Sequence, residues 1–378
     1  MLMVYVPEDM LLWDFWLAPR RVGSGDPYHL FYLQAPRDLP DAELRHERAT
    51  IGHAVSDDLI TWDSRGTALM AGPEGSWDDL ATWTGCVVEH DGTWYLFYTG
   101  RGRQDRTQRI GVATTTDPSL SAWKRGEDNP IVVADPRFYE RPDPVNWADG
   151  QACRDPWVSY EPEEDAWYMF FTARANHGPI DERGVIGLAR STDLLHWDQL
   201  PPASEPGEFG HLEVPQPVQI GDEWYLFFCT NLHSSQRANR VPDDATWAGT
   251  HYLVADDLVG PYRLTHDEPL VGDGPGTFYA GRVVEDPTGQ LVFLAWRSRD
   301  DEGRFLGGLS NPASITQHPD GRLTVDATAL WPGWEQLSAG ASPIDTGTAG
   351  SVSPDEASPG AGPPAAELPV PVSTDSVD

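Results

Sequence analysis

The 378-residue chain has little positive charge and almost no lysine. It contains 59 acidic side chains against 26 basic ones, for a formal net charge of −33, and Lys124 is its one lysine. A chain this acidic repels phosphate backbones, so we expect no binding to nucleic acid. It also has no apolar run of 18 residues, so we expect no membrane-spanning helix and no membrane partner.

Cysteine is scarce as well, and Cys86, Cys153 and Cys229 lie far apart in the sequence. Three scattered cysteines are too few for a disulfide framework, and none of them forms a CxxC pair. We therefore expect free, mostly buried thiols, with Cys153 in a packing role. No group of ligating residues has the spacing of a metal site, so we expect neither a metal nor another cofactor.

The N-terminal residues lack the features of a signal peptide. No positively charged segment precedes them, and Pro7, Glu8 and Asp9 stand where a signal peptide is apolar. The sequence therefore predicts a cytoplasmic protein. The acidic excess suggests a halophile's cytosol, because repulsion between charges is screened to within about 3 Å at molar salt. Nothing in the sequence indicates an oligomeric state.

Aromatic residues are abundant and change in frequency along the chain. The sequence has 16 Trp, 12 Tyr and 12 Phe, which is enough to bury a sizeable core. Residues 338–378 instead consist mainly of Ala, Gly, Pro, Ser and Thr, with no aromatic and no basic residue. Such a segment cannot offset its ordering entropy, so we expect a folded domain over 1–337 and a disordered C-terminal tail over 338–378.

An apolar and aromatic segment occurs five times within the folded part. Its copies are bounded by Gly, Asp and Glu, a pattern typical of buried strands. They are YHLFYLQ (28–34), WYLFYTG (94–100), WYMFFTA (167–173), WYLFFCT (224–230) and, more weakly, LVFLAWR (291–297).

A second segment follows each copy of the first. In it, a strand leads into a Ser/Thr-Asp-Asp turn and a closing aromatic residue. The copies are IGHAVSDDLITW (51–62), IGVATTTDPSLSAW (110–123), IGLARSTDLLHW (186–197), HYLVADDLVGPY (251–262) and the degenerate FLGGLSNPASI (305–315).

The order and spacing of these segments predict the fold. Five antiparallel units with almost no helical periodicity indicate an all-β five-bladed β-propeller. Successive copies begin 57 to 73 residues apart, which is longer than a WD40 blade of about 40–45 residues. An all-β sandwich would explain the strands and turns, but it would not explain five copies in the same order.

Carboxylates lie shortly before three of the five apolar segments. The inner strands of a propeller surround a central channel, so residues at matching positions point to one place. Asp14, Asp155 and Glu213 occupy such positions, and aromatic residues occupy the matching positions of the other repeats. The sequence therefore predicts a cluster of three acids with aromatic neighbours, as a glycosidase needs.

Each acid also has a plainer interpretation. Asp155 precedes a proline and could be a turn residue, and Asp14 could belong to a loop near the N-terminus. Arg154 favours an ionised, positioned Asp155 over a plain turn. Glu213 lies in an apolar strand, where desolvation raises a carboxyl pKa toward that of a general acid. The shared position of all three acids favours the site.

The motifs resemble those of glycoside hydrolase family 32, the invertase and β-fructosidase group. The segment IGHAVSDDLITW is similar to the GHAxSxDLxxW signature of that family. The other motifs follow in the family's order across roughly residues 13–300: YHLFYLQ (28–34), TGCVVEHDGTWYLFYTG (84–100), RDP (154–156), LEVPQ (212–216) and FYAG (278–281). The resemblance implies a five-bladed propeller and a retaining mechanism on β-fructofuranosides such as sucrose or fructans, with water or a sugar as acceptor.

The resemblance also implies a role for each acid. Asp14 would be the nucleophile, Asp155 the transition-state stabiliser that bonds sugar hydroxyls, and Glu213 the general acid/base. From the residues themselves, we expect further contacts to the carbohydrate substrate from Trp13, Gln34, Trp83, Arg154 and Tyr279. We expect His53, although it lies inside the signature, to be a structural strand histidine.

Some motifs depart from the family pattern and leave alternatives open. The first motif is LLWDFWLAP, which is closer to the WDSWP of the related family 68, the levansucrases, than to WMNDPNG. The acid/base motif is EVP rather than ECP. One alternative is an inverting family 43-like arabinofuranosidase, arabinanase or xylosidase that uses the same three acids. Another is a non-catalytic carbohydrate-binding propeller.

Overall fold

The computed structural model describes residues 5–21, 23–141, 152–231, 248–273, 276–299 and 304–330. All of its strands and helices belong to the compact unit Met1–Gly340. The expected tail, 338–378, lies outside the described residues. No helix in the described part of the chain is long and apolar enough to cross a membrane.

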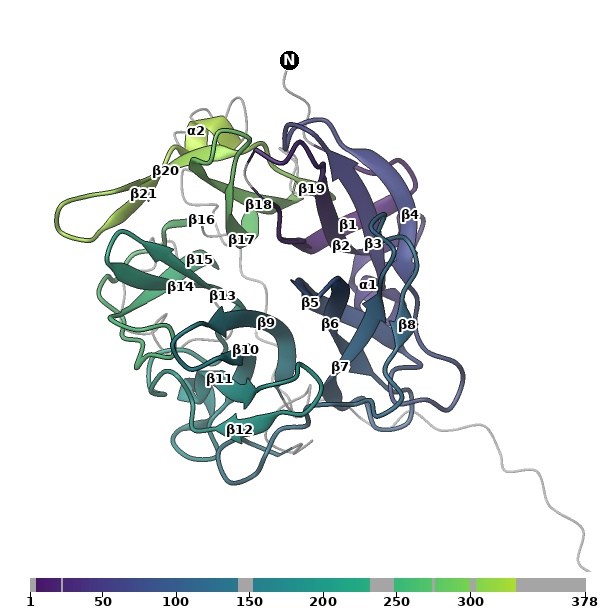
Figure 1. Ribbon diagram of the computed structural model, residues 1–378, viewed down its shortest axis with the longest axis horizontal. Coiled ribbons are helices and arrows are strands. Elements are labelled where there is room, and N and C mark those ends of the chain that lie inside the picture. The colour runs from purple at the N-terminus through teal and green to yellow at the C-terminus, as the bar shows by residue number, and fades with distance from the viewer. Residues whose placement is uncertain are drawn as a thin grey trace, which may run out of the picture. The chain divides into compact units, whose positions relative to one another are not determined.

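Five small antiparallel sheets are arranged as the blades of a β-propeller around a central axis (Figure 1), which confirms the predicted fold class. The strands are β1 (Met10–Leu17), β2 (Tyr28–Pro36), β3 (Thr50–Ser56) and β4 (Asp63–Leu69) in blade 1; β5 (Ala81–His90), β6 (Thr93–Arg101), β7 (Gln108–Thr115) and β8 (Lys124–Arg125) in blade 2; β9 (Cys153–Glu161), β10 (Ala166–Arg174), β11 (Gly184–Ser191) and β12 (Asp198–Leu200) in blade 3; β13 (Glu213–Ile220), β14 (Glu223–Thr230), β15 (Ala248–Ala255) and β16 (Val271–Asp273) in blade 4; and β17 (Phe278–Glu285), β18 (Leu291–Arg299), β19 (Phe305–Leu309), β20 (Ala313–Gln317) and β21 (Leu323–Val325) in blade 5. The described helices are short: η1 (Ala42–Leu44), α1 (Arg45–Arg48), η2 (Ile180–Glu182) and α2 (Ala327–Leu330).

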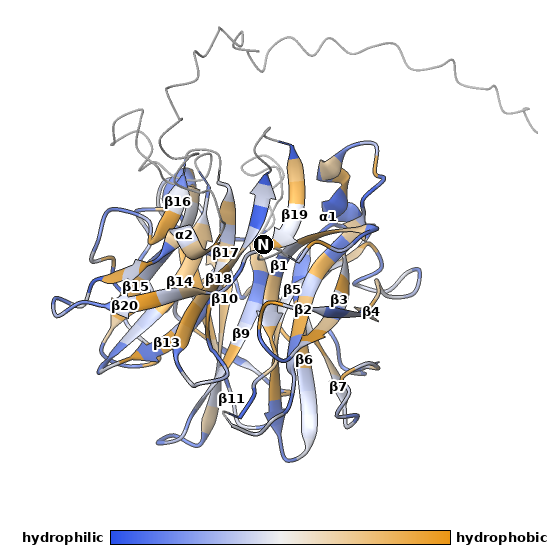
Figure 2. Ribbon diagram, turned by 90° about the horizontal axis from the view of Figure 1, so that it is seen from above, coloured by the Kyte–Doolittle hydropathy of each residue, from blue (hydrophilic) through white to orange (hydrophobic). Residues whose placement is uncertain are grey.

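The five apolar segments form the second strand of each blade, and the following segments form the third. Every residue of β10 is buried, because neighbouring blades cover both faces of the sheet. Burial on both faces explains why these segments read as continuous apolar runs rather than as alternating patterns. Figure 2 shows this distribution, with apolar residues on strands such as β13 and β14 and a hydrophilic α1.

The predicted turn after the third strand is present in the structure. In blade 1, the Ser56 hydroxyl accepts the amide N–H of Leu59 at 2.9 Å, and the Asp58 carboxylate accepts the next two amides. In blade 3, the Ser191 hydroxyl accepts the amide N–H of Leu194 at 2.9 Å. Ser and Asp side chains favour such turns because their oxygens satisfy nearby backbone donors.

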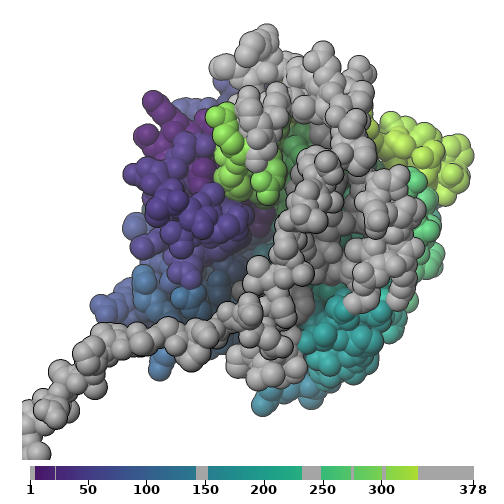
Figure 3. All heavy atoms as spheres, turned by 180° about the vertical axis from the view of Figure 1, so that it is seen from behind, coloured from purple at the N-terminus to yellow at the C-terminus, as the bar shows by residue number. Residues whose placement is uncertain are grey.

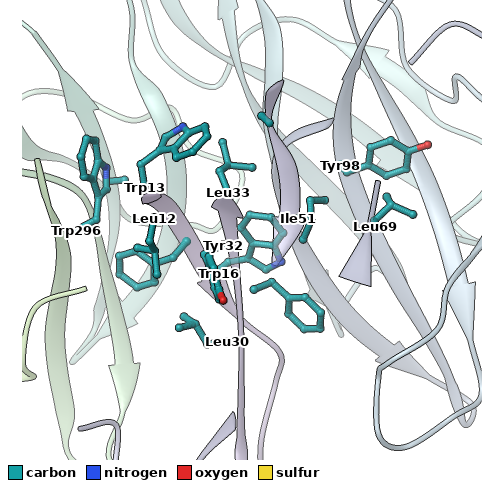
Figure 4. Packing of buried hydrophobic residues seen from close by; sticks show 14 of the residues in the cluster. Leu12, Trp13, Trp16, Leu30, Tyr32, Leu33, Ile51, Leu69, Tyr98 and Trp296 are labelled. Atoms are coloured by element: carbon teal, nitrogen blue, oxygen red, sulfur yellow. The ribbon is translucent and has the colours of Figure 1, made fainter. Parts of the chain in front are cut away.

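Blade 5 differs from the others because its second strand, β18, pairs with both β19 and β20. The ring closes there, since the amide N–H of Leu309 in β19 donates to the carbonyl of Tyr5 at 2.8 Å. Figure 3 shows β19 in green against the purple N-terminal blade. Trp13 and Trp296 belong to the same buried apolar cluster across this junction (Figure 4).

The first strand of each blade contacts the first strand of the next, so β1, β5, β9, β13 and β17 surround the axis. In every blade the chain enters at this inner strand and continues outward to the second strand. The inner strands therefore run in the same direction through the channel. Their first residues meet at one mouth of the channel, and their last residues meet at the other.

Candidate active site

All five inner strands break their pairing register near the same mouth of the channel. The shifts fall at Trp13/Phe15, Trp83/Gly85, Glu213/Gln216 and Tyr279/Arg282 on the inner strands, and at Phe170/Thr172 opposite Asp155. A bulge inserts an extra residue and redirects its side chain. The three predicted acids lie at these points, so the bulges turn them toward the channel.

Three residues at the bulges have left-handed backbone conformations. Their φ angles are 57° at Asp155, 56° at Val214 and 48° at Ala280. This region is unusual for any residue other than Gly and is most unfavourable for a β-branched one such as Val214. Each such residue costs on the order of 1–3 kcal/mol, and such strain is concentrated at functional sites. The Val214 amide N–H donates to Asp155 Oδ2 at 3.2 Å, which helps to hold the conformation.

Asp14 lies at the bulge of β1 and accepts a hydrogen bond from the Thr84 hydroxyl at 2.7 Å. Burial raises the pKa of the Asp14 carboxyl, and the neighbouring Glu213 raises it further. Thr84, His46 and Arg282 act in the opposite direction because they stabilise the ionised form.

Asp155 is almost fully buried, at 3% exposure. Its Oδ2 accepts the Thr172 hydroxyl at 2.9 Å and lies 3.5 Å from Arg154 Nε. Burial raises the pKa of Asp155 to about 7; Arg154 lowers it, whereas the other two carboxylates of the cluster raise it. The three acids therefore interact electrostatically, although each comes from a different blade.

Glu213 lies at the start of β13, between two hydrogen-bond donors. Arg154 Nη2 donates to its Oε1 at 2.7 Å, and the Tyr279 hydroxyl donates to its Oε2. Burial raises the pKa of Tyr279 well above its usual value, so this phenol stays protonated and acts as a donor. Both carboxylate oxygens of Glu213 thus have a fixed partner.

Arg154 is itself held in place by two neighbours. Its Nη1 donates to Gln108 Oε1 at 3.1 Å, and its Nη2 lies 3.0 Å from His211 Nδ1. Burial lowers the pKa of His211 well below its usual value, and Arg154 lowers it further. His211 is therefore neutral, and its Nδ1 can accept the arginine N–H.

These side chains line a cavity of about 720 Å³ at this mouth of the channel. The structure brings together seven of the eight predicted site residues there: Trp13, Asp14, Trp83, Arg154, Asp155, Glu213 and Tyr279. It does not bring Gln34 into the cavity. The Gln34 amide instead donates to the hydroxyls of Thr67 at 2.8 Å and Thr50 at 3.4 Å inside blade 1.

His53 and the cysteines lie outside the lining of this cavity. His53 stacks on Phe31 at a ring-centroid distance of 4.8 Å and is buried in blade 1, as expected of a structural histidine. The three cysteines are buried, free thiols. Among the described residues, no group of three or more His, Cys, Asp or Glu side chains is arranged to hold a metal ion.

Arg282 is a buried residue of β17 that the sequence motifs did not identify, and the same is true of the buried residues Thr84, Gln108 and His211. Arg282 is 1% exposed, and its Nε donates to the carbonyl of Phe15 at 3.1 Å. Its Nη1 donates to the carbonyls of Val214 at 2.9 Å and Pro215 at 3.1 Å. It thereby ties together the strands that carry Asp14 and Glu213. The sequence feature that could have identified Arg282 is its position directly after the FYAG motif.

A five-bladed propeller whose inner strands bring three carboxylates into one aromatic-lined cavity is typical of a glycoside hydrolase. The chain belongs to glycosyl hydrolase family 32, because the model of that family's N-terminal domain matches residues 22–311. This match confirms the resemblance in the sequence motifs. Asp14 lies before the matched range.

Sequence relatives include a β-fructofuranosidase, insoluble isoenzyme, from Arabidopsis thaliana and a sucrose-6-phosphate hydrolase from Bacillus subtilis. The first is 26% identical over 345 residues, covering 84% of this chain and 59% of the relative. The second is 26% identical over 290 residues, covering 73% of this chain and 53% of the relative. The chain thus spans little more than half the length of these relatives.

Solved structures show the same fold at lower sequence identity. An inulosucrase from Halalkalicoccus jeotgali bound to kestose has a TM-score of 0.68 at 23% identity, covering 85% of this chain and 90% of that chain. A β-fructofuranosidase of Bombyx mori has a TM-score of 0.63 at 19% identity, covering 88% of this chain and 65% of that chain.

Proposed function

We propose that the chain is a retaining glycoside hydrolase or transglycosylase that acts on β-fructofuranosides such as sucrose or fructans. The observation that carries this proposal is that three acids from three blades line one cavity. Asp155 is linked to the backbone of β13, and Arg154 contacts both Asp155 and Glu213. Membership of family 32 and the names of the relatives support fructose as the transferred sugar.

In the first step, the Asp14 carboxylate attacks the anomeric carbon of the fructosyl unit. The bond from that carbon to the leaving oxygen breaks, and protonated Glu213 gives its proton to this oxygen. Asp14 is then joined to the sugar through an ester bond. The Thr84 hydroxyl, which bonds Asp14 Oδ2, leaves Oδ1 as the attacking oxygen.

In the second step, Glu213 acts as a base and takes a proton from water or from an acceptor sugar. The activated oxygen attacks the anomeric carbon, and the ester bond to Asp14 breaks. Arg154 and Tyr279 hold the two oxygens of Glu213, so its carboxyl group keeps one orientation through both steps. Two inversions at one carbon give net retention.

Asp155 and the aromatic side chains complete the proposed mechanism. The Asp155 carboxylate bonds ring hydroxyls while positive charge develops on the sugar, as the family resemblance implies. The indoles of Trp13 and Trp83 and the ring of Tyr279 provide apolar faces on which a sugar packs. Both the Thr172 hydroxyl and the Val214 amide bond Oδ2 of Asp155, which leaves Oδ1 for the substrate.

The proposal is tested by incubation with sucrose, sucrose 6-phosphate, inulin, levan and arabino-oligosaccharides. We expect release of fructose with the β-anomer formed first, as observed by NMR before mutarotation. Glu213→Ala and Asp14→Ala should each lose nearly all activity, and azide should rescue Glu213→Ala by forming a β-fructosyl azide. An inverted first product, activity on arabino-oligosaccharides alone, or fructose release that persists in both variants would contradict the proposal.

We further propose that residues 1–337 form the glycosidase domain without 338–378, and that the protein works in a salt-rich cytosol. The compositional change near Ser338 supports the first part. The net charge of −33 and the near absence of lysine support the second. Stability as a function of salt concentration tests the second part.

A further inference from the structure

A second cavity, of about 460 Å³, lies at the opposite ends of the same inner strands. Its walls include Leu17 of β1, Val88 of β5, Trp157 of β9, Val218 of β13 and Val284 of β17. The catalytic acids lie at the beginnings or bulges of these strands, so the second cavity opens toward the other mouth of the channel. Its volume is within the roughly 300–1,000 Å³ typical of small-molecule pockets.

One buried cation belongs to the lining of this otherwise largely apolar cavity. Arg282 is 1% exposed, and its guanidinium lies 4.9 Å from the ring centroid of Trp157, which also lines the cavity. Its Nε and Nη1 are bonded to backbone carbonyls, as described above. Within the described part of the chain, no acceptor bonds its Nη2. Among the described residues, Nη2 of Arg282 is not one of the fully buried polar atoms that lack a partner, so its unused donor is accessible to solvent or to a ligand.

The charges around the second cavity favour an anion. Arg20 and Arg282 line it, and Glu285 is the single acidic residue in the lining. Asp14 and Asp155 also act on Arg282, but they belong to the lining of the catalytic cavity. A positive excess at one cavity stands out in a chain whose net charge is −33.

We propose that the second cavity binds a small organic carboxylate with an apolar body. The carboxylate accepts a hydrogen bond from Arg282 Nη2, and the apolar body packs against Trp157, Val88 and Val284. A charge-assisted bond to a buried guanidinium supplies direction, and the apolar walls supply affinity. This site is separate from the proposed glycosidase chemistry and does not depend on it.

The proposal is tested by titrating octanoate into the full-length protein and measuring heat by calorimetry. We expect saturable binding of one octanoate per chain. Octan-1-ol, which keeps the apolar body but lacks the charge, should bind at least about tenfold more weakly, and so should acetate, which keeps the charge but lacks the body. Equal binding of octanoate and octan-1-ol, or no saturable binding of octanoate, would overturn the proposal.

A matched pair of variants tests whether octanoate binds in the second cavity. Val284→Trp fills the second cavity with an indole and should weaken octanoate binding at least about tenfold. Val133→Trp makes the same change at a valine that is 43% exposed and does not line the cavity, so it should bind like the parent. Thermal unfolding checks that both variants fold. Unchanged octanoate binding in a folded Val284→Trp would refute the site, as would an equal loss in both variants.

Discussion

Asp155 gives the sharpest test of the electrostatics of the site. Its pKa is about 7 in the folded chain, against 3.8 for a free carboxyl, and burial is the main cause. A carboxyl whose pKa is raised by folding stabilises the folded state fully below pH 3.8, and this contribution is lost as the pH rises to 7. The perturbation we propose is Asp155→Asn, which keeps the shape and a hydrogen-bonding group but cannot ionise.

The size of the expected change in folding free energy follows from the shift in the pKa of Asp155. A difference of about 3 pH units corresponds to about 4 kcal/mol of folding free energy, at about 1.4 kcal/mol per unit. Over the whole titration the parent should therefore lose about 4 kcal/mol relative to Asp155→Asn, about 3 kcal/mol of it between pH 4 and pH 7. The difference between the two proteins should become constant about one pH unit above the pKa of Asp155.

The assay is urea unfolding of both proteins at fixed salt, followed by tryptophan fluorescence at several pH values from 4 to 8. Subtracting one free energy from the other cancels the acids that titrate alike in both proteins. If the difference in unfolding free energy between the two proteins stays constant from pH 4 to 8, burial does not raise the pKa of Asp155. A parent that gains stability over the variant with rising pH would reverse the sign and refute the reasoning.

Three further predictions concern packing, the acid/base residue and salt. Gly85→Ala should unfold the protein or cost more than about 3 kcal/mol, since a Cβ there would lie 1.9 Å from the carbonyl oxygen of Phe97. Gly92→Ala, at a turn with open space, should cost only about 1 kcal/mol in the same urea assay. Tyr279→Phe removes the donor to Glu213 Oε2 and should lower kcat on sucrose about 10- to 100-fold. The reason is that hydrogen bonds to charged groups contribute about 1.5–3 kcal/mol. A kcat equal to that of the parent would contradict the assigned contact. The melting temperature should rise between 0.1 and 2 M KCl because added ions screen the charge of −33, and a constant or falling melting temperature would refute the salt hypothesis.

Much of the fold could be predicted because the apolar segments repeat. Most residues of each second strand are buried on both faces, so these strands appear in the sequence as continuous apolar and aromatic runs rather than as alternating patterns. The three acids could be recognised from the sequence because they occupy matching positions in the repeats, and matching positions of a propeller's inner strands point to one place in the channel. Asp14, Asp155 and Glu213 all line the first cavity.

The finer features of the site depend on contacts that a linear pattern does not show. Gln34 was expected to contact sugar, but its amide is bonded to Thr50 and Thr67, which belong to later strands of its own blade. The bulges shift the side-chain alternation by one residue, so a period of two does not reveal which side chains face the channel. Nothing in a valine indicates the positive φ of Val214. The role of Arg282 depends on carbonyls from two other blades.

The closure of the ring has a consequence for the order in which the protein is made. The proposed nucleophile, Asp14, belongs to blade 1, which is synthesised before the other four blades, yet β1 packs against β17, β18 and β19 of blade 5. The bond between Tyr5 and Leu309 joins parts of the chain that are separated by most of its length. Four more blades are therefore synthesised after Asp14 before the surroundings of this residue are complete. A ribosome-bound chain that lacks blade 5 should hold all three acids and remain inactive, because site assembly and ring closure are one event.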